Sequence, residues 1–144
     1  MISPFLIFMA CSTHHNAKGL LFQEEGQLRL GTPEGKMYIL HAGDDSQYLT
    51  HLTGCGATVS GSRLARHIWL SKWHITDAGD GSEPFLGMIR MQGFKIFLRD
   101  INTGQELEIL EGDALFQWDG KPVLVTGVIV GAHQIRLVSY RVLE

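Results

Sequence analysis

An internal repeat is the feature of this sequence that most constrains its fold. Three segments recur in the same order, each combining glycine with alternating apolar residues. Residues 35–40 (GKMYIL) match 93–98 (GFKIFL), residues 54–61 (GCGATVSG) match 120–127 (GKPVLVTG), and residues 68–75 (IWLSKWHI) match 135–142 (IRLVSYRV). Alternation with glycine at corners indicates β-strands joined by turns. The 144 residues therefore predict two small domains of related structure.

Composition excludes several classes of protein. A hydrophobic content of 44% excludes a wholly disordered chain, and no apolar run approaches the length of about 20 residues that a transmembrane helix requires. The 17 glycines exceed the roughly ten that average usage gives, and a repeat explains the excess as turn glycines used twice. The net charge of −3 provides no overall attraction to nucleic acid or to an anionic membrane.

The second copy, residues 85–144, has the clearer strand pattern. Strands are expected at 85–90, 95–100, 106–110, 122–130 and 134–143, with a short helix within 112–118. Three strands, a short helix and two strands follow one another in the OB-fold, a five-stranded Greek-key barrel.

The first copy, residues 26–76, shows the same plan in reduced form. Its strands are expected at 27–30, 37–41, 57–60 and 67–75, and one helical piece at 46–52 replaces the third strand and the helix. Residues 77–84 (DAGDGSEP) form a turn-rich linker between the copies. We therefore expect an all-β protein of two tandem, degenerate OB-like small β-barrels, with a short helix in at least one copy.

The pattern resembles the small OB-like domains of bacterial envelope proteins and lipoproteins. The resemblance rests on the Gly-x-x-Tyr-x-Leu segment at 35–40, on the segment of glycines and valine at 54–61, and on an apolar alternating strand with an aromatic residue. It covers residues 26–75 and again 85–143. The resemblance implies a fold and a cellular compartment, and it carries over no catalytic residue.

The start of the chain resembles the end of a bacterial lipoprotein signal peptide. Residues 1–10 (MISPFLIFMA) are almost entirely apolar and directly precede Cys11. The resemblance implies that Cys11 is lipidated and that Ser12 favours the outer membrane, with the protein facing the periplasm. Residues 11–25 are then expected to be a tether. No Lys or Arg precedes this short run, so a buried first strand or an apolar tail is the alternative for residues 1–10.

The sequence contains no recognisable catalytic or metal-binding motif. The seven histidines form neither HExxH nor another ligand spacing, and the two cysteines form no CxxC pair. A nucleophile elbow of the GxSxG type and a phosphate-binding loop are both missing. We therefore expect no enzymatic activity, no cofactor and no metal.

Aromatic and basic residues give the strongest indication of binding. Trp69 and Trp73 are four residues apart, so they are expected on one face of the last strand of the first copy. Arg63 and Arg66 are expected in the turn before that strand. These four residues are the candidates for contact with a partner. The alternative is that the aromatic residues fill the cores of two very small barrels.

A second set of aromatic residues bears on nucleic-acid binding. Tyr38, Phe94 and Phe97 are expected on the second strand of each copy, with lysines and arginines nearby. Strands two and three of an OB-fold can hold single-stranded nucleic acid by base stacking. The acidic balance of charge disfavours nucleic acid as a partner.

These observations favour a non-enzymatic envelope lipoprotein, a binding or scaffolding module held at the membrane by a lipid on Cys11. Its partner would be another envelope protein or a polymer. The alternative is a single-stranded nucleic-acid-binding OB-fold protein in which residues 1–10 belong to the fold.

Overall fold

The structure is a computed structural model that describes residues 13–44 and 46–143. Strands account for 62% of the chain and helices for 6%, so the expected all-β class is confirmed. The chain divides into two compact units between Thr76 and Asp77, where the repeat predicts the end of the first copy. The predicted signal segment and the lipidation site Cys11 lie outside the described residues.

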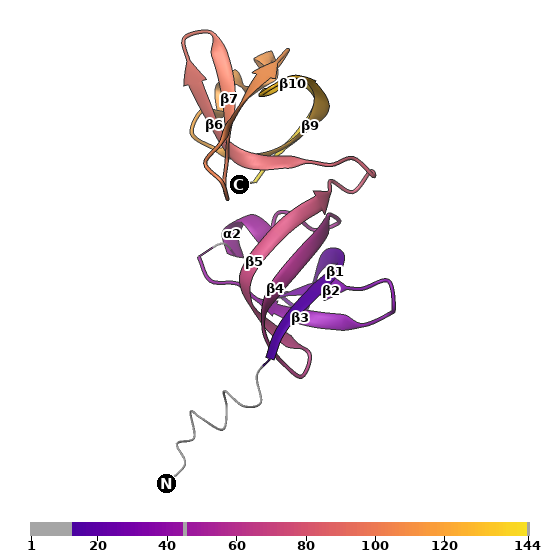
Figure 1. Cartoon of the computed structure of the whole chain (residues 1–144). Helices are drawn as coiled ribbons and strands as arrows, with labels where there is room; N and C mark the ends of the chain where they lie inside the picture. The colour runs from indigo at the N-terminus through magenta and orange to yellow at the C-terminus, as the bar shows by residue number, and fades with distance from the viewer. Residues whose placement is uncertain (1–12, 45, 144) are drawn as a thin grey trace. The chain divides into compact units, whose positions relative to one another are not determined.

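The N-terminal unit has five strands and one short helix, drawn from indigo to magenta in Figure 1. In chain order they are β1 (Thr13–Glu24), β2 (Gln27–Gly31), β3 (Met37–His41), α2 (Ser46–Leu49), β4 (Gly56–Leu64) and β5 (His67–Asp77). The strands lie side by side in the order β1-β2-β3-β5-β4, and β4 pairs back with β1 to close the sheet. The pairing of β3 with β5 is parallel, whereas β1 is antiparallel to both β2 and β4.

The C-terminal unit repeats this order of elements, drawn from orange to yellow in Figure 1. Its elements are β6 (Phe85–Gln92), β7 (Lys95–Asp100), β8 (Glu106–Leu110), the 3-10 helix η1 (Asp113–Trp118), β9 (Pro122–Gly131) and β10 (Gln134–Val142). The strand order is β10-β8-β7-β6-β9, and the antiparallel pairing of β9 with β10 closes the ring. Its one parallel pairing joins β8 to β10, the third and fifth strands of the unit.

The prediction of a tether at residues 11–25 is wrong from Thr13 onwards, because Thr13–Glu24 form β1. This strand pairs with β2 on one side and with β4 on the other. Its inward positions carry His15, Ala17 and Gly19, and only Leu21 is fully buried. A strand is recognised in sequence by the alternation of apolar and polar residues. Because most inward residues of β1 are small or polar, this alternation is missing.

The cores of the two units correspond position by position. A cluster of eight buried residues fills the C-terminal unit, and each has a buried counterpart 66 to 69 residues earlier in the chain. The pairs are Leu21 and Ile89, Leu28 and Ile96, Leu30 and Leu98, Leu40 and Ile109, Leu49 and Leu115, Ala57 and Val123, Val59 and Val125, and Ile68 and Ile135. Burial of this matched set gives both units the same inner surface.

One of the three sequence matches pairs strands that are not equivalent. Residues 35–40 lead into β3, the third strand of its unit, whereas residues 93–98 lead into β7, the second. The counterpart of β7 is β2, which follows the turn at Gly26 as β7 follows Gly93. A glycine turn followed by alternating apolar residues fits any strand, so the short match misleads. The other two matches align β4 with β9 and β5 with β10.

Hydrogen bonds around the turn before the fourth strand are also repeated. The Gly54 N–H donates to the Leu21 carbonyl, and the Gly120 N–H donates to the Ile89 carbonyl, each at 2.8 Å. Both glycines have positive φ, +89° and +79°, a conformation that glycine adopts at little cost. These bonds attach the turn to the middle of the first strand in each unit.

The sequence suggests that Gly61 and Gly127 are turn glycines. The structure shows instead that they lie inside β4 and β9. A Cβ on Gly61 would overlap the carbonyl oxygen of Trp69, and one on Gly127 would overlap that of Arg136. Glycine is therefore required here by the close approach of two backbones, which lets the fourth and fifth strands bend tightly around the barrel.

We expect Gly127→Ala to destabilise the chain by about 1–3 kcal/mol, because backbone must move to admit the methyl group. Gly43→Ala is the matched control, since no atom lies within 4 Å of the position of its Cβ. Urea denaturation of both variants measures the difference in the free energy of unfolding. Equal stability of the two variants would contradict the role given to Gly127.

Candidate binding site

The parallel pairing of β3 with β5 creates the candidate site. Its central pair, Leu40 and Ile68, points into the barrel and is buried. The residues on either side point outward, so that His41 lies beside Trp69 and Ile39 lies beside His67. Alternation along two adjacent strands thus presents two imidazoles and an indole on one outer face.

We call His41, His67 and Trp69 the ring cluster. The ring centroids of His41 and Trp69 are 4.8 Å apart with planes at 12°, a stacked arrangement. His41 also stacks on His67, with centroids 5.0 Å apart, and its Nε2 lies 2.7 Å from Nδ1 of His67, within hydrogen-bonding distance. Trp69 nevertheless keeps 42% of its surface exposed. The cluster therefore holds an exposed indole in a fixed orientation.

The surroundings of His41 favour its neutral form. Burial lowers the pKa of His41 below its usual value of 6.5, and the proximity of His67 lowers this pKa further. Protonating both rings would place two positive charges against each other and remove the hydrogen bond between them. The lowered pKa therefore favours an uncharged imidazole at His41, stacked on Trp69.

A cleft of about 340 Å³ opens beside His41. Its polar lining residues include Gln23, Gln27 and Thr50, and its apolar lining comes from β2 and β3, with Leu28 and Ile39. Besides His41, no ionisable side chain lines it among the described residues. Amide and hydroxyl groups next to aromatic rings suit a polar ligand without charge.

The four residues predicted to contact a partner do not form one cluster. Trp69 belongs to the ring cluster, whereas Trp73 is 8% exposed and belongs to the core. Alternation fails between them because two consecutive residues, Ser71 and Lys72, are both exposed. The equivalent stretch of β10 has a register shift between Leu137 and Ser139, typical of a β-bulge. A bulge reverses the face on which the following residues lie, so the prediction of one shared face is wrong.

The two predicted arginines have different surroundings. The Arg63 guanidinium lies 5.4 Å from the centre of the Tyr38 ring, and its Nε donates to the Ala65 carbonyl at 2.8 Å. Arg66 is exposed in the turn between β4 and β5, and its carbonyl accepts a 2.7 Å hydrogen bond from the N–H of Ile39. Only Arg66 directly precedes the ring cluster in sequence.

The aromatic residues considered for nucleic acid do not share one strand position. Tyr38 lies on β3, the third strand, and is 4% exposed. Phe94 lies in the turn between β6 and β7 and is 96% exposed, and Phe97 lies on β7. Their expected assignment to the second strands holds for Phe97 alone.

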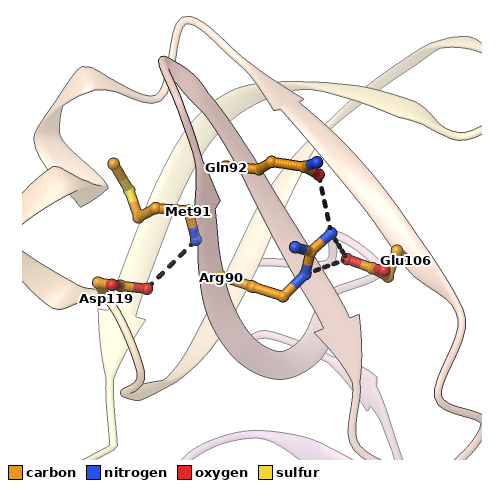
Figure 2. A network of polar contacts seen from close by, with 5 residues as sticks. All are labelled: Arg90, Met91, Gln92, Glu106 and Asp119. Atoms are coloured by element: carbon orange, nitrogen blue, oxygen red, sulfur yellow. Dashed lines mark hydrogen bonds and ion pairs between the residues drawn. The ribbon is translucent and has the colours of Figure 1, made fainter.

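The corresponding face of the C-terminal unit has a different chemistry. Figure 2 shows Arg90 of β6 pointing to Glu106, with Nε to Oε2 at 2.6 Å, while Gln92 approaches the same guanidinium. Arg90 also lies over the Phe97 ring, 5.0 Å from its centre. On the other side of the same strand segment, Asp119 accepts a hydrogen bond from the Met91 N–H (Figure 2). On this face Arg90 and Glu106 neutralise each other.

The ring cluster has no counterpart in that unit. The register of the parallel strands places Leu110 where the first unit has His41 and Arg136 where it has Trp69. Gln134 replaces His67, and its Nε2 donates to Glu108 at 3.1 Å. The fold therefore does not require the three rings.

Sequence reasoning missed His41 and His67, which were not among the candidate residues. A signal was available in the spacing of each strand. His41 lies two residues after Ile39, and His67 lies two residues before Trp69, so each histidine shares the outer face of its strand with an apolar or aromatic residue. Only the parallel register of β3 and β5 brings the two histidines together.

Within residues 13–44 and 46–143, no three His, Cys, Asp or Glu side chains are grouped so that they could hold a metal ion. Over the same residues, no helix has the length and apolar character to cross a membrane. A comparison of the chain with protein-family models finds no match, and a comparison with curated proteins finds none either.

The lowered pKa of His41 predicts how stability changes with pH. The unfolded chain binds a proton near pH 6.5, whereas folded His41 binds it only at lower pH, so the free energy of unfolding falls as the pH decreases below 6.5. His41→Phe keeps an aromatic ring beside Trp69 and cannot be protonated. Denaturation is measured at pH 7.5 and at pH 5, which lie on the order of one unit either side of the usual histidine pKa. Between them the free energy of unfolding should fall less for His41→Phe than for the wild type. An identical loss in both proteins would contradict the assignment.

Proposed function

We propose that this chain is a non-enzymatic bacterial envelope lipoprotein built from two tandem OB-like barrels, and that its N-terminal unit binds an uncharged glycan polymer at the ring cluster. The observation that carries the proposal is the exposed Trp69 indole, held flat against His41 beside a cleft lined by uncharged side chains. A sugar ring has one flat face of C–H groups and an edge of hydroxyl groups, which these two surfaces complement.

The order of strands supports the OB-like part of the proposal. In each unit, the third and fifth strands are parallel neighbours and a short helix precedes the fourth strand. This is the arrangement expected of a five-stranded Greek-key barrel of the OB type. The matched cores and the matched turns at Gly54 and Gly120 support descent of both units from one duplicated barrel.

The charges near the ring cluster favour a neutral polymer over nucleic acid. Nucleic-acid affinity depends on unpaired Lys and Arg side chains that reach phosphates. Arg29, on the same outer face as Ile39, is 3.9 Å from Glu25 and donates to Gln27 at 3.0 Å. A neutral glycan needs no such cation.

Binding to β-1,4-linked N-acetylglucosamine oligomers, followed by calorimetry, tests the site. We expect Trp69→Ala to weaken binding by more than about tenfold, because a stacking platform contributes on the order of 1–3 kcal/mol. Phe94→Ala is the matched control, since Phe94 is exposed in the other unit. Equal binding by the two variants contradicts the site. Salt-sensitive binding to oligothymidylate, with no binding to the sugar, would instead support the nucleic-acid alternative.

The anchor is tested separately by weighing the protein from fractionated cells. Residues 1–10 should be absent and Cys11 should carry acyl chains, which place the protein in the membrane fraction. Cys11→Ala should retain the segment and lose the acyl mass. An unprocessed protein in the soluble fraction would overturn the envelope assignment and leave the ring cluster unaffected.

A further inference from the structure

Part of β9 in the C-terminal sheet lacks a partner strand, whereas the equivalent part of β4 in the N-terminal sheet has one. In the N-terminal unit, β1 pairs with β4 along its length as far as Thr13 and Arg63. In the C-terminal unit, the pairing of β6 with β9 stops at Phe85 and Val125, although β9 continues to Gly131. Among the described residues, no strand pairs with that edge of residues 126–130.

The linker explains why β6 starts so late. The Asp77 carboxylate accepts hydrogen bonds from the N–H groups of Gly79 and Gly81 at 2.7 and 3.0 Å. The Asp80 carboxylate accepts another from the Ser82 N–H at 3.0 Å. These turns fold residues 77–82 onto themselves, so that the linker cannot extend β6 as residues 13–16 extend β1.

The uncovered edge is apolar. Val128 and Ile129 are each 54% exposed and Val130 is 40% exposed. The equivalent residues of β4 are Ser62, Arg63 and Leu64, so the fold itself does not demand apolar side chains at these positions. Edge strands that stay solvated normally carry charge, proline or a bulge. The register shift between Gln134 and Ile135 leaves Val130 as an extra residue at the end of this edge, a bulge. Residues 122–131 contain no charged residue, so this edge lacks any charge that would repel a second strand.

We propose that residues 126–130 of β9 pair antiparallel with the same residues of a second copy of the chain, around a two-fold axis. A register centred on Val128 sets the two Val128 side chains opposite each other and places each Ile129 opposite Gly127, which has no side chain. No like charges meet across the axis, which makes the segment complementary to itself. In this arrangement the partner's β9 pairs with the edge of β9, as the start of β1 pairs with β4 in the N-terminal unit.

Sedimentation velocity over a range of concentrations tests the proposal on the full chain, and circular dichroism confirms that each variant folds. The wild type should form a dimer. Val128→Lys and Val128→Glu should each weaken association by more than about tenfold, because like charges would face each other in a partly dry interface. A mixture of the two variants should restore association, since a lysine at position 128 of one copy then faces a glutamate at position 128 of the other. Phe94→Lys, on an exposed turn of the same unit, is the control and should still dimerise.

Hydrogen exchange distinguishes edge pairing from other contacts. Alternate amides within residues 126–130 should become protected as the dimer forms, because their N–H groups then donate to the partner strand. The proposal is overturned by a chain that stays monomeric, by variants that leave the dimer intact, by a mixture that fails to restore it, or by protection of these amides in the monomer. None of these outcomes depends on glycan binding or on the lipid anchor.

Discussion

The parallel pairing between the third and fifth strands is the interaction on which each unit depends. It spans three residue pairs in both sheets, with Leu40 against Ile68 in one and Ile109 against Ile135 in the other. All four side chains are buried, so the segments that form the parallel pairing also complete the core. In the N-terminal unit the same register fixes what the outer face displays, because His41 and Trp69 are direct neighbours across it.

A strand is predicted well from the sequence when its inward positions carry large apolar residues. The last strand of the first unit and the last two strands of the second were predicted close to their observed bounds, since their inward positions are apolar, whereas β4 runs four residues past its predicted end, to Leu64. The first strand was missed because close backbone approach requires Gly19 at an inward position, beside His15 and Ala17. Trp73 was placed on the wrong face because two consecutive exposed residues, Ser71 and Lys72, shift the alternation of β5. The histidine pair depends on a contact between strands distant in sequence.

The two units show how one set of inward residues can support different outer surfaces. The eight residues of the core cluster in the second unit all have buried counterparts in the first. The outer face of the first presents stacked rings, and that of the second presents the ion pair of Arg90 with Glu106. The second unit also has a run of three exposed apolar residues, Val128–Val130. Duplication would free each copy to specialise, with glycan binding proposed for the first and self-association for the second.

The 2.7 Å approach of His41 to His67 has a consequence for the ligand. When both rings are neutral, a single proton lies between the two nitrogens. If His41 donates it, the other nitrogen of His41 is an acceptor and that of His67 is a donor. If His67 donates it, the roles exchange. In both tautomers the pair offers one donor and one acceptor outward, and a hydroxyl group, which donates and accepts at once, is served equally by either arrangement.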